Sequence, residues 1–165
     1  NIILTICIVM MLLYMFVSFV KDNKNRKDTK SHNEDDAQKV VSRKLIVPLK
    51  IQAYERLMLY IERIKFPVLV KRVFNPVMSR NDFHFSLLQN VQDEFEHNLA
   101  QRLYVTEETS QLVNLAKEKV LQNINAVFND NPDADVAMIA QQIASFENPM
   151  VEKAVVSIKY EFNSL

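Results

Sequence analysis

Residues 48–65 read PLKIQAYERLMLYIERIK, and this stretch determines the fold class that we expect. Four apolar side chains recur in it at intervals of three and four residues: Tyr54, Leu57, Ile61 and Ile64. This spacing places them on one face of an α-helix, because a helix completes one turn in about 3.6 residues. The segment therefore predicts an amphipathic helix that Pro48 begins and Phe66-Pro67 ends.

Downstream, the same periodicity predicts four more helices, at about residues 81–104, 106–129, 132–146 and 149–162. Each begins at a residue suited to capping a helix: Ser79 or Asn81, Thr106, Asn131 and Asn148. The buried face of the first of these helices is predicted to be formed by Leu88, Val91, Phe95, Leu99 and Leu103. Residues 67–80 are expected to be irregular, with a short strand at 68–73 as an option. The short connections favour a small bundle of antiparallel neighbours.

The composition supports an all-α fold, because the chain contains no glycine. Phosphate-binding loops, dinucleotide-binding loops and nucleophile elbows need glycine for close backbone approach or for a strained turn. A chain without glycine is therefore not expected to contain these motifs, which argues against the enzymes that depend on them. The one cysteine, Cys7, excludes a disulfide within the chain and a zinc site built from several thiolates. We therefore expect no catalytic residues, no metal site and no cofactor.

Upstream, the chain begins with a nearly continuous apolar run from Ile2 to Val20. A helix of that length rises about 28 Å, close to the thickness of the hydrocarbon core of a bilayer. The run is longer than the apolar region of a cleavable signal peptide and lacks a small-residue cleavage site, so a transmembrane anchor is favoured. Five cations follow it directly and predict a cytoplasmic flank: Lys21, Lys24, Arg26, Lys27 and Lys30.

These features divide the chain into three predicted segments. Residues 1–20 form the transmembrane helix, residues 21–44 a charged juxtamembrane tether, and residues 45–165 a cytoplasmic helical domain. The tether is expected to lack regular structure, because it is rich in charge and has no apolar periodicity.

Charge is distributed unevenly although the chain carries no net charge. Residues 39–80 hold ten basic and two acidic side chains, whereas residues 81–165 hold five basic and thirteen acidic ones. The basic half could face anionic lipid or another acidic surface. The two halves could equally pack together and neutralise each other. A third and less favoured alternative is a regulator that binds nucleic acid through residues 39–80, but no nucleic-acid module signature accompanies them.

Six exposed charges form the candidate interaction surface of the domain: Glu55, Arg56, Glu62, Arg63, Lys71 and Arg72. A second candidate constellation is the Glu-x-x-His spacing of Glu94 and His97, which places both side chains on one helix face, as in di-iron bundles. Such bundles need two of these motifs and two further carboxylates, and His97 is expected to point outward. A helical metalloprotein that uses Glu94 and His97 is therefore kept only as an alternative.

Two motifs carry a resemblance to a known family: QAYERL at 52–57 and EFEHN at 94–98. Over residues 45–128 the chain resembles an uncharacterised family of small single-pass inner-membrane proteins of Bacteroidota-type bacteria. The resemblance implies a bacterial inner-membrane setting and supplies no activity or site residue. Together with the sequence, it predicts a membrane-anchored helical interaction protein, an accessory or scaffolding subunit of a larger inner-membrane complex. Its expected partners are the membrane and other proteins of that complex, and the oligomeric state stays open.

Overall fold

The computed structural model describes the backbone of residues 2–165 and the side chains of residues 10, 11, 13–19, 21 and 40–165. Residues 2–165 contain helices and no strand, which confirms the all-helical fold class. The elements are α1 (Ile2–Ile64), α2 (Phe66–Val73), α3 (Arg80–His97), the 3₁₀ helix η1 (Leu99–Tyr104), α4 (Glu107–Asp130), α5 (Val136–Ala144) and α6 (Pro149–Asn163). No described residue has a positive φ angle, which agrees with a chain that folds without glycine.

The chain divides into two compact units, Asn1–Ile46 and Val47–Leu165, and α1 contributes to both. Within the part of the chain whose side chains are described, no helix is long and apolar enough to cross a membrane. The predicted span of residues 1–20 falls largely on side chains outside that part, at positions 1–9, 12 and 20, so it stays a prediction.

The predicted tether differs from the structure in its backbone. Residues 21–47 are helical and belong to α1, and Pro48 lies inside this helix instead of beginning one. Residues 21–47 contain six Lys and two Arg, which are good helix formers, so the lack of an apolar stripe does not prevent a helix. The side chains of residues 22–39 lie outside the described part, and these include four of the five predicted membrane-proximal cations: Lys24, Arg26, Lys27 and Lys30. Lys21 is described and exposed.

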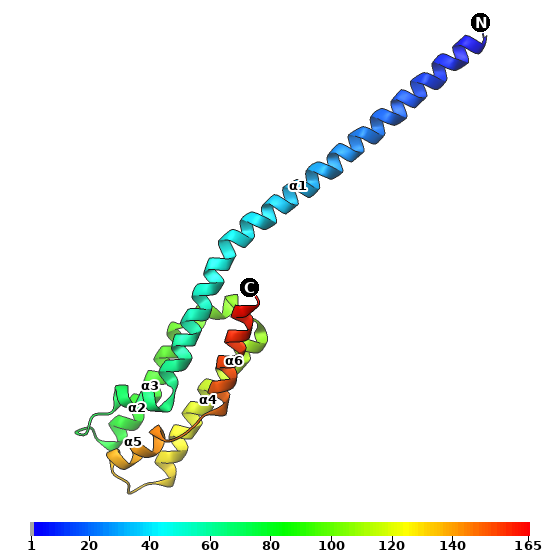
Figure 1. Cartoon of the computed structure of the whole chain (residues 1–165). Coiled ribbons are helices and arrows are strands. Elements are labelled where there is room, and N and C mark those ends of the chain that lie inside the picture. Colours follow the sequence, from blue (N-terminus) through cyan, green and yellow to red (C-terminus); the bar gives the residue numbers. More distant parts are fainter. Residues whose placement is uncertain (1) are drawn as a thin grey trace. The chain divides into compact units, whose positions relative to one another are not determined.

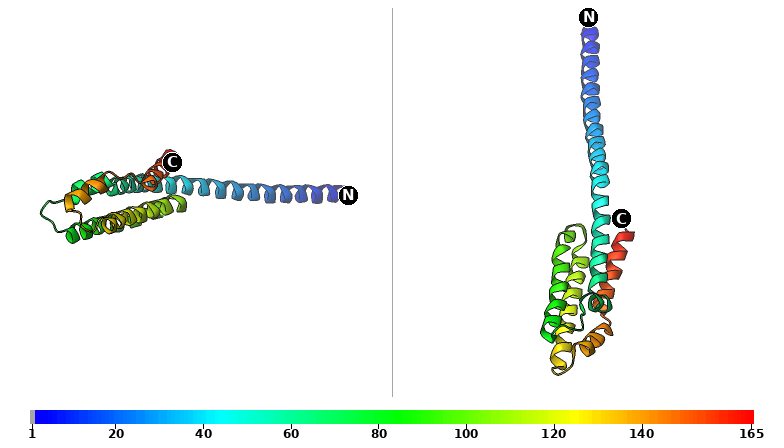
Figure 2. Two further views of the ribbon diagram at one scale, coloured as in Figure 1. Left: turned by 90° about the horizontal axis from the view of Figure 1, so that it is seen from below. Right: turned by 90° about the vertical axis from the view of Figure 1, so that its left-hand side faces the viewer.

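The second unit is a bundle in which α3, α4 and α6 lie alongside the last turns of α1 (Figures 1 and 2). Helices α2 and α5 pack against each other at the end of the bundle where α1 stops. The core contains fully buried side chains from α1, α2, α3, α4, α5 and α6, among them Leu57, Leu69, Phe83, Ile124, Ile139 and Ile158. The expected stripe of the last turns of α1 is buried as predicted, since Tyr54, Leu57, Ile61 and Ile64 are each at most 4% exposed.

Three of the predicted helix starts are confirmed by their capping hydrogen bonds. Ser79 accepts from the Asp82 amide, Thr106 from the Thr109 amide, and Asn148 from the Met150 amide. The expected cap at Asn131 is wrong, because α5 begins only after Asp135, whose carboxylate accepts from the Met138 amide at 2.7 Å. Asp135 is as good a cap as asparagine, and residues 131–134 form a turn instead.

The optional strand at 68–73 is also wrong, since these residues belong to helix α2. Pro67 lies in the first turn of α2, where the missing amide costs nothing, and Leu69 is buried against the bundle. The long helix predicted at 81–104 ends at His97, and η1 completes it. A 3₁₀ helix has three residues per turn, so the apolar phase shifts, and Leu99 and Leu103 are 46% and 83% exposed instead of buried.

Candidate functional site

The candidate site is a polar cavity between the last turns of α1 and helix α3, which we call the arginine pocket. Its volume is about 470 Å³. Helix α1 lines it with Arg56, Leu59, Tyr60 and Arg63, and helix α3 lines it with Asn90, Asp93, Glu94 and His97, followed by Asn98. Each set follows the spacing i, i+3, i+4, i+7, so two single helix faces form the walls.

Glu94 is the centre of the charged contacts at this site. The Nε atom of Arg63 donates to its Oε1 atom at 2.6 Å, and Nη2 of Arg63 lies 2.6 Å from the same oxygen in an ion pair. Nη1 of Arg72, on α2, donates to the same oxygen at 2.9 Å, and Nη2 of Arg72 donates to Oδ1 of Asn90 at 3.3 Å. The side chain of Glu94 is only 17% exposed. One half-buried carboxylate therefore holds two guanidinium groups that come from different helices.

Tyr60 lies at the inner side of the arginine pocket and is 1% exposed. Its ring packs on Phe95, with 6.1 Å between ring centroids, and Lys117 covers the Phe95 ring at 4.3 Å. The Tyr60 hydroxyl is buried and has no hydrogen-bond partner among the described residues. Burial raises the pKa of Tyr60, and the negative charges of Glu94 and Glu118 raise it further. The hydroxyl therefore stays protonated and is an unused donor.

The structure brings together three of the six residues predicted as the interaction surface. Arg56 and Arg63 line the arginine pocket, and Arg72 reaches it through Glu94. The other three are separate from it. Glu62 pairs with Lys65 at 2.8 Å, Lys71 is exposed on α2, and Glu55 lines a mainly apolar groove of about 450 Å³ beside α6.

The Glu94 and His97 pair of the metalloprotein alternative lines the same pocket. Glu94 already accepts hydrogen bonds from two arginines, so a metal ion there would compete with both guanidinium groups. His97 is exposed, as its spacing predicted. No cluster of three or more potential ligands (His, Cys, Asp or Glu) occurs in the part of the chain that the structure describes with side chains.

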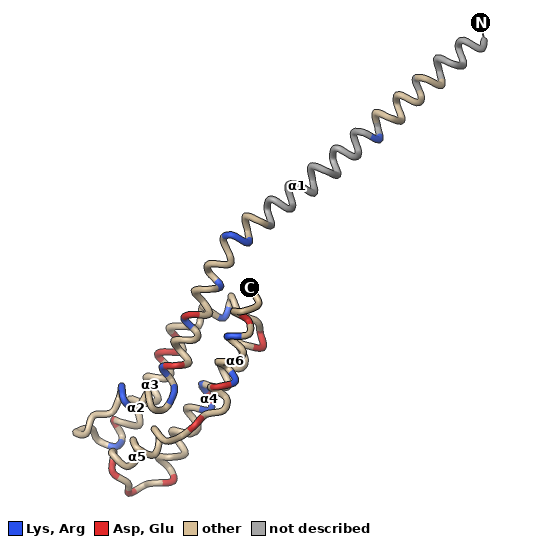
Figure 3. The backbone as a smooth tube through the Cα atoms, in the orientation of Figure 1, with Lys and Arg blue, Asp and Glu red and all other residues tan. Residues whose placement is uncertain are grey.

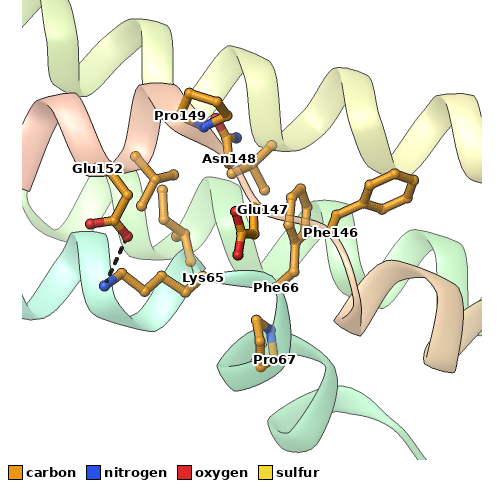
Figure 4. A pocket seen from close by; sticks show the side chains of 11 residues that line it. Lys65, Phe66, Pro67, Phe146, Glu147, Asn148, Pro149 and Glu152 are labelled. Carbon is orange, nitrogen blue, oxygen red and sulfur yellow. Dashed lines mark ion pairs between the residues drawn. The ribbon is translucent and has the colours of Figure 1, made fainter.

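A second cavity, of about 470 Å³, lies where α2 and α6 begin (Figure 4). Lys65 lines it and contacts Glu62 at 2.8 Å and Glu152 at 3.3 Å. The hydrogen bond to Glu62 is the main reason that the pKa of Lys65 is raised, although burial lowers it. Glu147 and Asn148 also line the cavity. Carboxylates outnumber cations here, and most other lining residues are apolar, so this cavity is a weaker candidate for a charged ligand.

A buried network at the other end of α6 was not predicted from the sequence. Glu161 is 9% exposed and accepts a hydrogen bond from the Tyr54 hydroxyl at 3.0 Å and from the Thr106 amide at 3.1 Å. The Thr106 hydroxyl also donates to it. Burial by itself raises the pKa of Glu161, but the hydrogen bonds from Thr106 and Tyr54 help to lower it below the ordinary value. The network joins α1, α6 and the residue that caps α4.

The packing of the basic segment against the acidic segment neutralises part of the charge asymmetry. Arg63 and Arg72 pair with Glu94, and Lys65 pairs with Glu152. Figure 3 shows both signs of charge on the last turns of α1. The guanidinium of Arg56 has no acidic partner among the described residues. Positive charge therefore remains at the arginine pocket, at Arg56.

Comparison with known families shows that the chain belongs to a family of unknown function (DUF7935), whose model matches residues 1–165. The predicted resemblance to an uncharacterised family is confirmed to that extent. No curated protein and no solved structure matches the chain.

Proposed function

We propose that this member of the DUF7935 family is a membrane-anchored helical interaction protein, an accessory or scaffolding subunit of a larger inner-membrane complex. Its N-terminal apolar segment holds it in the membrane, and its helical unit, residues 47–165, binds a partner protein. The motifs QAYERL and EFEHN, with their resemblance to bacterial single-pass proteins, support the inner-membrane setting. The cations after residue 20 support a cytoplasmic position for the helical unit.

One observation carries the membrane anchor. Eight large apolar side chains between Met10 and Phe19 are each 54–76% exposed: Met10, Met11, Leu13, Tyr14, Met15, Phe16, Val17 and Phe19. Successive helical residues differ by about 100° in direction, so these side chains surround the helix on all sides. Such a surface is unfavourable in water, and lipid hydrocarbon is an environment that covers every face of a single helix.

The anchor is tested by introducing charge into the apolar segment. A full-length variant with both Leu13→Arg and Phe16→Arg is expected to leave the membrane fraction after alkaline extraction, because each arginine opposes insertion by about 2.5–3.5 kcal/mol. The matched control is Arg43→Gln together with Lys44→Gln, two exposed positions beyond the apolar segment. If the charged variant stays in the membrane as the wild type does, the segment is not the anchor.

The interaction role is tested by purification of the tagged full-length protein from its native membrane in mild detergent. We expect one membrane protein to copurify in a fixed ratio, and the activity of that protein then defines the process that this chain serves. Recovery of the chain alone, as a monomer or as a homo-oligomer, contradicts the accessory-subunit proposal.

A further inference from the structure

We propose that the arginine pocket binds a carboxylate of a partner polypeptide, an aspartate or glutamate side chain that lies between Arg56 and Arg63. This inference rests on the proposed interaction function and names the chemistry of the partner at this surface. It depends on three features of the pocket: an excess of hydrogen-bond donors, a net charge of the right size, and a buried hydroxyl that lacks an acceptor.

Donors exceed acceptors in the pocket. Three guanidinium nitrogens, two from Arg63 and one from Arg72, lie 2.6–2.9 Å from the single Oε1 atom of Glu94. A guanidinium has five N–H donors, so Arg63 keeps several that do not point at Glu94. Asp93, the other acid that lines the pocket, already accepts a hydrogen bond from Gln89 at 2.6 Å. Arg56 has no acidic partner in the part of the chain that the structure describes. The guanidinium of Arg56 is therefore a donor group at the pocket that lacks an acidic acceptor among the described residues.

The net charge favours a single negative charge on the ligand. Arg56 and Arg63 line the pocket and Arg72 reaches it through Glu94. Against these stand the carboxylates of Asp93 and Glu94, which leaves one positive charge when His97 is neutral. A carboxylate matches this charge and fits the planar fork of a guanidinium in two parallel hydrogen bonds. A phosphate group carries about −1.5 to −2 at neutral pH, more than the one residual positive charge balances.

Tyr60 supplies an independent indication of a ligand. Its side chain is 1% exposed and lines the pocket, and its hydroxyl has no partner among the described residues. A buried donor without an acceptor is costly, and such groups in a folded protein call for an explanation. Arg56, Tyr60 and Arg63 occupy positions i, i+4 and i+7 of one helix, so their donors lie along one face. A carboxylate between the two arginines adds the acceptor that this face lacks.

The test uses the full-length chain in nonionic detergent, with ¹⁵N-labelled arginine, and two short alanine-based peptides. One peptide carries a single central glutamate and the other a glutamine at the same place. We expect the glutamate peptide to shift the side-chain N–H signals of Arg56 and Arg63 saturably, and to bind at least about tenfold more tightly than the glutamine peptide. Arg56→Gln should weaken binding of the glutamate peptide by about tenfold. Lys119→Gln, an exposed cation on α4, is the matched control and should leave binding unchanged.

Tyr60→Phe separates a binding role from a structural one. The substitution removes the Tyr60 hydroxyl, which is buried and has no hydrogen-bond partner among the described residues. The ligand-free variant should therefore be at least as stable as the wild type. Binding of the glutamate peptide should nevertheless fall by about threefold or more, because the bound state loses a hydrogen bond.

Three results would overturn the proposal: equal binding of the two peptides, no binding of either, or equal losses for Arg56→Gln and Lys119→Gln. Inorganic phosphate that binds more tightly than the glutamate peptide would instead make the pocket a site for free anions and would also overturn it. The proposed function stands or falls separately. A partner that copurifies equally well with the wild type and with Arg56→Gln would refute the pocket and leave the interaction role intact.

Discussion

Replacing Glu161 with glutamine is expected to destabilise the helical unit strongly, although the two side chains have nearly the same shape. Glu161 is 9% exposed, and its carboxylate lies among α1, α4 and α6. Its Oε2 atom accepts a hydrogen bond from the Tyr54 hydroxyl, and its Oε1 atom accepts one from the Thr106 hydroxyl. The Thr106 amide lies within hydrogen-bond distance of both oxygens. All three groups donate, so an acceptor-only carboxylate suits them, whereas the amide nitrogen of glutamine is itself a donor.

The magnitude follows from the bonds that glutamine cannot make. At least one charge-assisted hydrogen bond is lost, worth about 1.5–3 kcal/mol, and a buried donor is left facing another donor at a cost of about 1–3 kcal/mol. Because these contributions overlap, we expect a loss of about 3 kcal/mol in the free energy of unfolding. For a unit of this size, that loss corresponds to a decrease of about 10 °C in the melting temperature. Tyr54→Phe removes only one donor and should cost about 1 kcal/mol.

The same substitution should change the dependence of stability on pH. The pKa of Glu161 in the folded state is lowered, because its hydrogen bonds outweigh the effect of burial, while the unfolded chain has a pKa of about 4.3. A lowered pKa stabilises the fold above the unfolded-state pKa, and this contribution is lost as the pH falls through the folded-state pKa. Glu161→Gln does not titrate. The stability difference between the two proteins should therefore be full at neutral pH and shrink below about pH 4.3.

The assay is urea unfolding of the full-length chain in nonionic detergent, followed by circular dichroism at several pH values. Glu118→Gln, an exposed carboxylate on α4, is the control and should change the free energy of unfolding by at most about 0.5 kcal/mol. If Glu161→Gln loses no more than this control at neutral pH, the buried network does not stabilise the fold. If its loss is the same at pH 3.5 as at pH 7, the ionised carboxylate is not the stabilising species.

Three further predictions use the same unfolding assay. Ile124→Ala, at a fully buried position of α4, should lower the free energy of unfolding by about 2–5 kcal/mol. A decrease of less than about 1 kcal/mol would mean that the core of the bundle is packed differently. Asp135→Ala should lower the free energy of unfolding by about 1 kcal/mol, because α5 loses its cap. Asp133→Ala, in the preceding turn, should leave the free energy of unfolding nearly unchanged. Equal effects of the two substitutions would mean that α5 starts elsewhere. Glu94→Gln should lower the free energy of unfolding by about 1 kcal/mol at low salt. The decrease should be smaller at high salt, because Arg63, the partner of Glu94, is half exposed and salt screens the ion pair. A decrease that salt does not change would exclude a charge effect.

The sequence predicted best those features that depend on local chemistry. Ser79, Thr106 and Asn148 cap helices where expected, because a capping side chain needs only the amides two or three residues ahead. The buried stripe of α1 is likewise a property of one helix. Where two local choices compete, as between Asn131 and Asp135 for the start of α5, the sequence alone does not decide. The strand option at 68–73 failed because β-branched residues are compatible with a short helix once α5 and α3 cover it.

The candidate site was predictable only in part. Arg56, Arg63 and Arg72 were identified as exposed charges, and Glu94 and His97 as one helix face. Their common location depends on how α1, α2 and α3 pack, and the pattern of a single helix does not contain that information. Glu161 and Tyr54 are 107 positions apart, and nothing local marks either as a partner of the other. The 3₁₀ turn after His97 was missed for a similar reason, since a continued α-helix fits the apolar pattern to Leu103 equally well.

The arginine pocket is more informative for function than the rest of the bundle, because stability alone does not explain it. Two helices that pack through a polar face lose the apolar burial that leucines at those positions would provide, and ion pairs held partly away from water return little net stability. Elsewhere, α1 and α3 place apolar residues toward the core, among them Ile61, Phe83 and Val91. The chain nevertheless keeps three arginines, two carboxylates and an unpartnered tyrosine hydroxyl together at one site. A surface with this arrangement fits recognition of a charged partner better than it fits a contribution to folding.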